Sequence, residues 1–238
     1  YLKGNNPNGI SPAGDVYNEW LFNSNKIFNA GGNILSLLFA DTFESLSGIV
    51  LPGGMHSMLS NSNIVSAADL DFSGIAEIYP KAFEGLFINC TQLTTPPSFS
   101  TIVRLIKDNS MNSWGGNMNA LFQGCSSLTT PADLSGLKYA DAQYSLSGVY
   151  GGCTSLTEGP NITNIENLGD HCLADIFSGC TSLTKAYAPT ITWDTNKTNS
   201  WMANVSASGT LYADASIANT IPINSSSGCP SGWTVVTI

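Results

Sequence analysis

The sequence predicts an α/β repeat solenoid, in which short parallel strands and short helical or irregular segments stack into one elongated domain. One observation is a ten-residue motif that occurs four times, each copy being too short to fold alone. Another is the spacing of the cysteine in each copy, because 35, 28 and 27 residues separate Cys90, Cys125, Cys153 and Cys180 in turn. A period in the twenties is typical of stacked coils in which each unit covers the next.

The clearest copy of the motif, residues 175–184, reads DIFSGCTSLT. Residues 85–94, 120–129 and 148–157 keep its aromatic residue, its cysteine and its leucine in the same register. An earlier stretch keeps an apolar pair but carries Ser62 at the cysteine position, and it needs a one-residue gap to align. We interpret that stretch as a degenerate first unit.

Each unit is expected to run from a short helical or irregular segment into a turn at the cysteine, and then into a brief Leu-Thr strand that a proline closes. The leucines should point into the coil, while the threonines that follow them should form rows on an exposed parallel sheet. The leucines are Leu93, Leu128, Leu156 and Leu183, and the prolines are Pro96, Pro131, Pro160 and Pro189.

We expect residues 1–50 to form an N-terminal cap with the remnant of an upstream β domain, residues 51–190 the solenoid and residues 191–238 a C-terminal cap. Residues 16–30 predict two short strands joined by a turn, and Asn33 is placed to cap a short helix over residues 34–39. Because the sequence starts at Tyr1 without a leader, we expect it to be a processed chain or a domain of a longer one.

The cysteines of the motif (Cys90, Cys125, Cys153 and Cys180, here called the cysteine ladder) occupy one position of successive units. Neighbouring strands lie about 4.8 Å apart with parallel Cβ vectors, which matches a disulfide poorly. We therefore expect a column of buried free thiols. Cys172 and Cys229 lie outside the ladder, and a bridge between them stays open.

Composition excludes several classes of function. The net charge is −9 with a single arginine, so the basic surface that nucleic acid requires is missing. No run of 18 apolar residues is present to span a membrane. Only 11% of residues are charged, against about 25% in ordinary domains, so the surface is expected to be polar but nearly uncharged.

The motif, an aromatic residue followed by x-Gly-Cys-Thr/Ser-Ser-Leu-Thr and a later proline, resembles the BspA-like leucine-rich repeats of surface proteins from anaerobic bacteria and their phages. Residues 168–180 look like the full unit of that family, residues 31–38 resemble the segment that precedes the array, and residues 201–212 and 229–235 look like its C-terminal end. The resemblance implies a leucine-rich repeat fold and display on a surface, where some members act as adhesins. It carries no ligand-binding residue onto this chain.

Catalytic and metal-binding chemistry finds little support in the sequence. His171 adjoins Cys172, so their side chains should diverge, and His56 stands apart from both. The acidic pairs Asp69/Asp71 and Asp41/Glu44 lack the further ligands of a calcium or glycosidase site and are interpreted as capping or solvated acids. We expect no enzyme activity, no cofactor and no metal.

The longest interval between ladder cysteines, from Cys90 to Cys125, exceeds the next by seven residues and contains Arg104, Lys107 and Trp114. Insertions in repeat proteins form loops, often on the binding face, and Arg and Trp are enriched at binding hot spots. These three residues, with the exposed Thr130 and Thr157, are the candidate binding residues. The alternative is that residues 102–106 form an extra strand or helical turn packed on the coil, sealed by Trp114.

The favoured function is a non-enzymatic, surface-displayed module that binds a protein or glycan receptor, and it is extracellular. The alternative is a structural or receptor-binding part of a bacteriophage particle, which neighbouring capsid and tail genes would favour. A carbohydrate-active enzyme comes third, because the sequence shows no converging catalytic groups.

Overall fold

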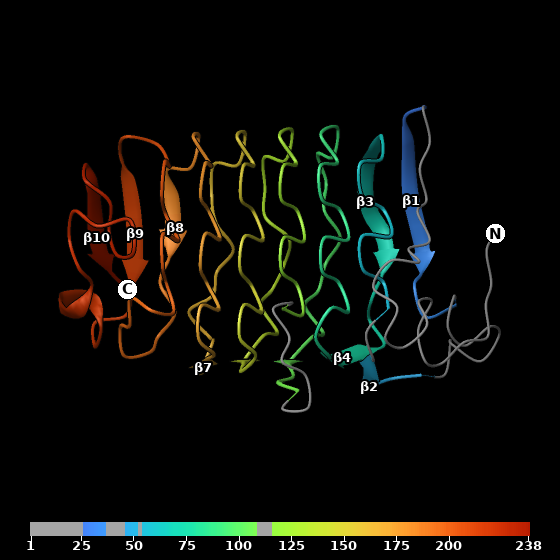
Figure 1. Cartoon of the computed structure of the whole chain (residues 1–238), viewed down its shortest axis with the longest axis horizontal. Coiled ribbons are helices and arrows are strands. Elements are labelled where there is room, and N and C mark those ends of the chain that lie inside the picture. Colours follow the sequence, from blue (N-terminus) through green and yellow to red (C-terminus); the bar gives the residue numbers. More distant parts are fainter. Residues whose placement is uncertain (1–25, 37–45, 52–53, 109–115) are drawn as a thin grey trace.

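The computed structural model describes residues 26–36, 46–51, 54–108 and 116–238 (Figure 1). The described part consists mostly of short parallel strands, with one 3₁₀ helix, η2 (Ala218–Thr220). No helix in those ranges is both long and apolar enough to cross a membrane. The strands are β1 (Phe28–Asn33), β2 (Ile49–Leu51), β3 (Ile64–Asp71), β4 (Ile75–Ile78), β5 (Arg104–Leu105), β6 (Tyr139–Ala140), β7 (Asn167–Leu168), β8 (Lys185–Tyr187), β9 (Gly209–Ala213) and β10 (Trp233–Thr237).

These strands make three sheets, all of them parallel. The largest has the order β2-β4-β5-β6-β7, a second has β10-β9-β8, and β1 pairs with β3. Figure 1 shows the chain winding past the same positions again and again, so that segments far apart in sequence lie side by side along the long axis. Each strand is only two to eight residues long. A strand of this length is not stable alone and depends on the strands paired with it.

Between the strands lie five turned segments, residues 55–62, 82–90, 117–125, 145–153 and 172–180. Within them the amides alternate between two kinds of acceptor. The N–H groups of Leu146, Gly148, Tyr150 and Gly152 donate to carbonyls of the next segment, at 2.7–3.0 Å. The intervening N–H groups donate to the carbonyl three residues back in their own segment. Every amide from Leu146 to Cys153 is thereby paired, which a buried backbone requires.

This pattern needs a left-handed residue at every fourth position. Two columns of such residues run along the stack, with φ between 52° and 77°. One column is Ser57, Gly85, Ala120, Gly148, Asp175 and Ser200, and the other is Asn61, Asn89, Gly124, Gly152, Gly179 and Asn204. Glycine and asparagine tolerate this conformation best, which explains the glycine before three of the ladder cysteines.

The two residues after each left-handed residue of the first column point inward, so each segment buries an apolar pair such as Leu86-Phe87 or Ile176-Phe177. The second members stack on one another. Ring centroids are 5.3 Å apart for Phe87 and Phe122, 5.6 Å for Phe122 and Tyr150, and 6.0 Å for Tyr150 and Phe177, with interplanar angles of 11–16°. Offset stacking at such distances stabilises a core beyond the burial of area alone.

The structure decides between two alternatives and corrects one expectation. Of the helical or irregular segment expected before each cysteine, the irregular form is present: a series of turns, because every fourth residue is left-handed. The exposed five-stranded sheet is also not built from the Leu-Thr steps. The leucine amides donate back to the cysteine carbonyls at 3.0–3.1 Å, so each leucine belongs to a tight turn. One position beyond the threonines, Thr95 and Glu158 make only isolated bridges, to Ser66 of β3 and Lys185 of β8.

Other expectations agree with the structure or lie outside the described residues. The four leucines are fully buried, and the threonines after them are exposed. Asn33 ends β1, and its Oδ1 accepts the Leu35 N–H at 2.8 Å, but residues 37–39 of the expected helix are not described. Residues 1–25, which include the expected remnant of an upstream β domain and most of the expected pair of strands over residues 16–30, also lie outside the described ranges. The two expected boundaries, after residues 50 and 190, fall within continuous structure. Strand β2 contains both residue 50 and residue 51, and β8, which precedes the second boundary, pairs with β9, which follows it.

The left-handed columns predict the effect of exchanging alanine and glycine. Ala120→Gly should stabilise the protein by about 0.5–1 kcal/mol, since relief of the left-handed conformation exceeds the entropy cost of glycine. Gly148→Ala should destabilise it by about 1 kcal/mol, because φ is 62° although no atom lies within 3.8 Å of an added Cβ. Urea unfolding measures both. Ala186→Gly, in β8, is the control and should destabilise; stabilisation there too would contradict the assignment.

A second prediction concerns the aromatic stack. Phe177→Ala should cost about 3 kcal/mol or more, because the ring is fully buried and lies against Gly159, where an added Cβ would come within 2.7 Å of it. Thr157→Ala should change the free energy of unfolding by less than about 0.5 kcal/mol, since Thr157 is exposed. Equal effects on thermal unfolding would show that the inward register is wrong.

Candidate functional site

The candidate site is the outer surface of the whole five-stranded sheet. We call it the β5 surface, after the central strand of that sheet, β5. One row of outward side chains crosses it in register, one from each strand, while the residues next in sequence point into the core. The outward row is Val50, Glu77, Arg104, Tyr139 and Asn167, and the inward row is Leu51, Ile78, Leu105, Ala140 and Leu168.

Arg104 lies in the middle of this row and is held on three sides. Its Nη1 is 2.7 Å from Asp141 Oδ2, and its Nε is 3.9 Å from Glu77 Oε1. The guanidinium carbon lies 4.2 Å from the centroid of the Tyr139 ring, a cation–π arrangement. Asn167 Nδ2 donates to the other oxygen of Asp141. The guanidinium is therefore ordered in advance while 37% of the side chain stays exposed.

Exposed apolar side chains also occur on or next to these strands. Seven large hydrophobic residues are exposed in the described part of the chain, and three of them, Val50, Tyr79 and Val103, belong to or adjoin β2, β4 and β5. A hydrogen bond with the Glu166 carboxylate raises the pKa of Tyr139, so that its hydroxyl stays protonated well into the alkaline range. The surface thus combines aromatic, apolar and paired charged groups, the composition typical of interface hot spots.

The hydrogen bonds locate the seven additional residues of the long interval. Ile106 N–H donates to Ile78 O, and Lys81 N–H donates to Gly116 O. These bonds mark equivalent positions in two neighbouring passages of the chain. The first passage covers the distance in three residues, from Ile78 to Lys81, whereas the second uses ten, from Ile106 to Gly116. The seven additional residues therefore follow β5 directly. Lys107 stands at its start and is exposed, whereas Trp114 lies outside the described residues.

The alternative interpretation of residues 102–106 is partly correct. Arg104 and Leu105 form β5, which pairs with β4 and β6, and Ile102 and Leu105 are buried. These residues are therefore a regular member of the sheet, and only the residues after Ile106 are additional. Trp114, which was expected to seal them, lies outside the described part of the chain.

The threonine candidates belong to a different part of the surface. Thr130 and Thr157 are exposed, and Thr157 N–H donates to Thr129 O at 3.3 Å. The residue after Thr157, Glu158, forms a bridge with Lys185 of the three-stranded sheet. The threonines therefore adjoin that sheet and not the sheet that carries Arg104. The structure thus brings Arg104 and Lys107 to one region and the threonines to another.

A second cluster of exposed polar and aromatic side chains, on β8 and β9, escaped the sequence analysis. Lys185 Nζ is 2.8 Å from Glu158 Oε1, which also accepts the Tyr187 hydroxyl at 2.9 Å. The Tyr187 and Tyr212 rings stack on each other with centroids 5.4 Å apart, and the Lys185 ammonium lies over both. Because the rings cover each other's faces, this cluster stiffens the sheet more than it offers a flat platform.

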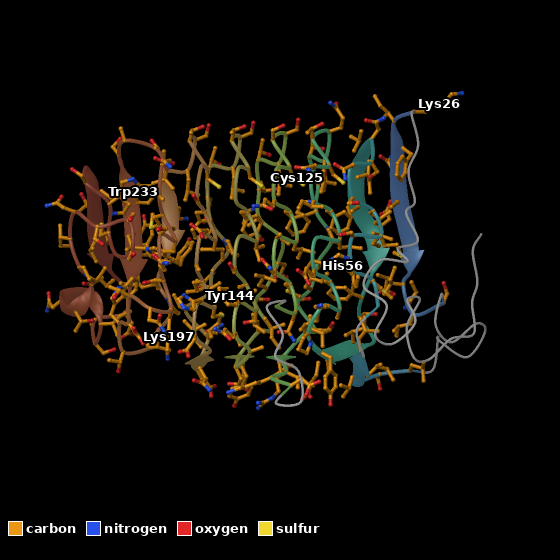
Figure 2. All side chains as sticks on the ribbon, viewed as in Figure 1. Lys26, His56, Cys125, Tyr144, Lys197 and Trp233 are labelled. Carbon is orange, nitrogen blue, oxygen red and sulfur yellow. The ribbon has the colours of Figure 1, made fainter. Side chains whose placement is uncertain are left out.

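The cysteine ladder is buried, and all six cysteines of the chain are free thiols (Figure 2, where Cys125 is labelled inside the stack). Each ladder thiol donates to a carbonyl of the preceding segment. Cys125, Cys153 and Cys180 reach the carbonyls of Phe87, Phe122 and Tyr150 at 3.0–3.1 Å. Burial raises the pKa of all four thiols, that of Cys180 to about 12. These groups are structural and unreactive in the folded chain.

The raised thiol pKa values predict alkaline lability. An unfolded thiol ionises near its ordinary value of 9.0, whereas Cys180 does so only near 12. The stabilising contribution is therefore complete below pH 9 and is lost as the pH rises toward 12. Urea unfolding between pH 9 and 10 should show the free energy falling by up to about 1.4 kcal/mol per pH unit and thiol.

Cys180→Ser provides the control for this experiment. Serine keeps a donor for the Tyr150 carbonyl but does not titrate, so the slope between pH 9 and 10 should become smaller. Buried Tyr150 also adds to the slope as the pH nears its ordinary value of 10.0, but it adds equally in both proteins and cancels in the comparison. A free energy independent of pH in this interval would contradict the buried ladder.

The remaining candidates for chemistry do not converge. His171 stacks on Tyr144 with ring centroids 5.0 Å apart, whereas Cys172 points inward and lies 3.0 Å from the Ser145 hydroxyl. The carboxylate of Asp71 accepts hydrogen bonds from Asn33 and Ser73. Asp41 and Glu44 lie outside the described ranges. Within those ranges, no three His, Cys, Asp or Glu side chains are grouped so that they could hold a metal ion.

Comparison of the chain with models of protein families, with curated proteins and with solved structures found no match.

Proposed function

We propose that this chain is a leucine-rich repeat solenoid of the BspA-like kind and serves as a non-enzymatic binding module on an extracellular surface, with the β5 surface as its contact region. The regular passage of the chain through five turned segments, each with an inward aromatic or leucine and a cysteine or serine, supports the solenoid assignment. The four sequence motifs coincide with four of these segments.

The single observation that carries the binding role is the ordered but exposed guanidinium of Arg104 beside Tyr139, on a sheet whose strands also carry or adjoin three exposed apolar side chains. An arginine fixed in advance loses less conformational freedom when a partner binds. Exposed apolar groups around it supply area that a partner can bury. A protein or glycan receptor fits this mixture better than a polyanion, since Glu77 and Asp141 balance the arginine.

The test is binding of the fluorescently labelled chain to a printed glycan array and to a panel of purified extracellular host proteins. Arg104→Ala and Tyr139→Ala should each weaken the strongest interaction at least about tenfold, as expected for hot-spot residues. Thermal unfolding should change little, because both side chains lie on the solvent face of the sheet.

Lys185→Ala is the matched control, because Lys185 is also a cation paired with a glutamate and stacked on tyrosine, but on the other sheet. It should bind like the unmodified chain. Loss of binding in Lys185→Ala together with normal binding in Arg104→Ala would place the contact region on the β8 and β9 side and refute the assignment to the β5 surface.

A further inference from the structure

The last strand, β10, forms the outer edge of the three-stranded sheet, and no strand of the described residues pairs with its free side. Its residues Trp233-Thr-Val-Val-Thr237 are all aromatic or β-branched, and it contains no proline, glycine or charge. Natural proteins usually protect such edges with charged side chains, proline or bulges. An edge of this composition is suited to pairing with another strand.

The stretch of chain that contains β10 carries no charged side chain. No Asp, Glu, Lys, Arg or His occurs from Ala215 to Ile238, although the chain has a net charge of −9. Two copies therefore repel each other least when they approach through this end. Three of the large exposed hydrophobic residues lie in this uncharged stretch, Ile223 at 58%, Val236 at 39% and Ile238 at 57% exposure. Figure 1 shows β10 at one extremity of the long axis.

The backbone fixes which groups of β10 are free. Ile238 N–H donates to Ala213 O of β9, and successive residues of a strand alternate in direction. Thr234 and Val236 therefore also direct their amides and carbonyls toward β9, whereas those of Val235 and Thr237 face away from it. Two residues separated by one position thus present free donors and acceptors on the open edge.

We propose that this edge pairs with β10 of a second copy of the chain, antiparallel and about a two-fold axis, to give an end-to-end dimer. Val235 and Thr237 of one copy would exchange four main-chain hydrogen bonds with Thr237 and Val235 of the other. In this register Val236 of one copy lies opposite Val236 of the other, on the two-fold axis. Thr234 of each copy lies opposite Ile238 of the other.

The side chains fit this register. Val236 lies beside Tyr212 in the sheet, and Tyr212 lies beside Tyr187, all on the outward face. Pairing across the axis would extend this apolar row into the second copy, with the two valines in the close, non-hydrogen-bonded position. The same strand edge serves both copies, as a closed two-fold interface requires. The dimer would also present two β5 surfaces on one particle.

The test is the mass of the chain in solution by analytical ultracentrifugation over a concentration series. A species of twice 25.1 kDa should form with increasing concentration. Val236→Lys places like charges opposite each other, and Thr237→Pro removes a free-edge donor without touching a bond to β9; both should remain monomeric. Val103→Lys, the same exchange at an exposed valine far from β10, should dimerise normally, and thermal unfolding verifies that each variant is folded.

Hydrogen exchange gives a second measurement that a merely destabilising variant would not reproduce. In the unmodified chain, the amides of Val235 and Thr237 should exchange more slowly as concentration rises, while the amide of Thr210, bonded to Thr184 O, should not change. A monomer at every concentration, a dimer that survives both β10 variants, or assemblies that grow beyond two copies would each overturn the proposal.

Discussion

The structure depends on one constraint, the division of the backbone amides of each turned segment between its own carbonyls and those of the next segment. Every second N–H leaves the segment, so each segment is completed only by its neighbour. From Leu146 to Cys153, for example, no backbone amide is left unpaired, although this segment is neither a helix nor a strand. The cost is a left-handed residue at every fourth position, including non-glycine residues such as Ala120 and Asp175.

The interior follows from this backbone. Because residues in the same position of successive segments lie one above another, like side chains form columns: the aromatic stack from Phe87 to Phe177 and the cysteine ladder beside it. A thiol suits its column because it is small and can share a carbonyl that already accepts an amide. Cys153 Sγ and Cys125 N–H both donate to Phe122 O. The buried Tyr150 hydroxyl is satisfied by accepting the Ala132 N–H at 3.2 Å.

The outer surfaces inherit the same register. On the five-stranded sheet it places Glu77, Arg104 and Tyr139 on neighbouring strands, so that charge pairing and cation–π contact order an arginine that would otherwise be mobile. At one end of the stack the same regularity leaves β10 paired only with β9, since no other strand of the described residues lies on its outer side. We infer that the uncharged strand β10 makes this end a surface for association.

The sequence by itself determined which residues face inward at the motif, because a cysteine, an aromatic residue and a leucine recurring in one register must share one environment. It also located the long interval and singled out Arg104. The kind of backbone was decided only in the tertiary structure, since apolar residues at i, i+3 and i+4, such as Met118, Leu121 and Phe122, fit an α-helix as well as a chain of four-residue turns. Strands of two residues are too short for an alternating pattern, so the position of the five-stranded sheet could not be predicted. The partners of Arg104 come from separate passages of the chain, and only the stacking of those passages brings them together.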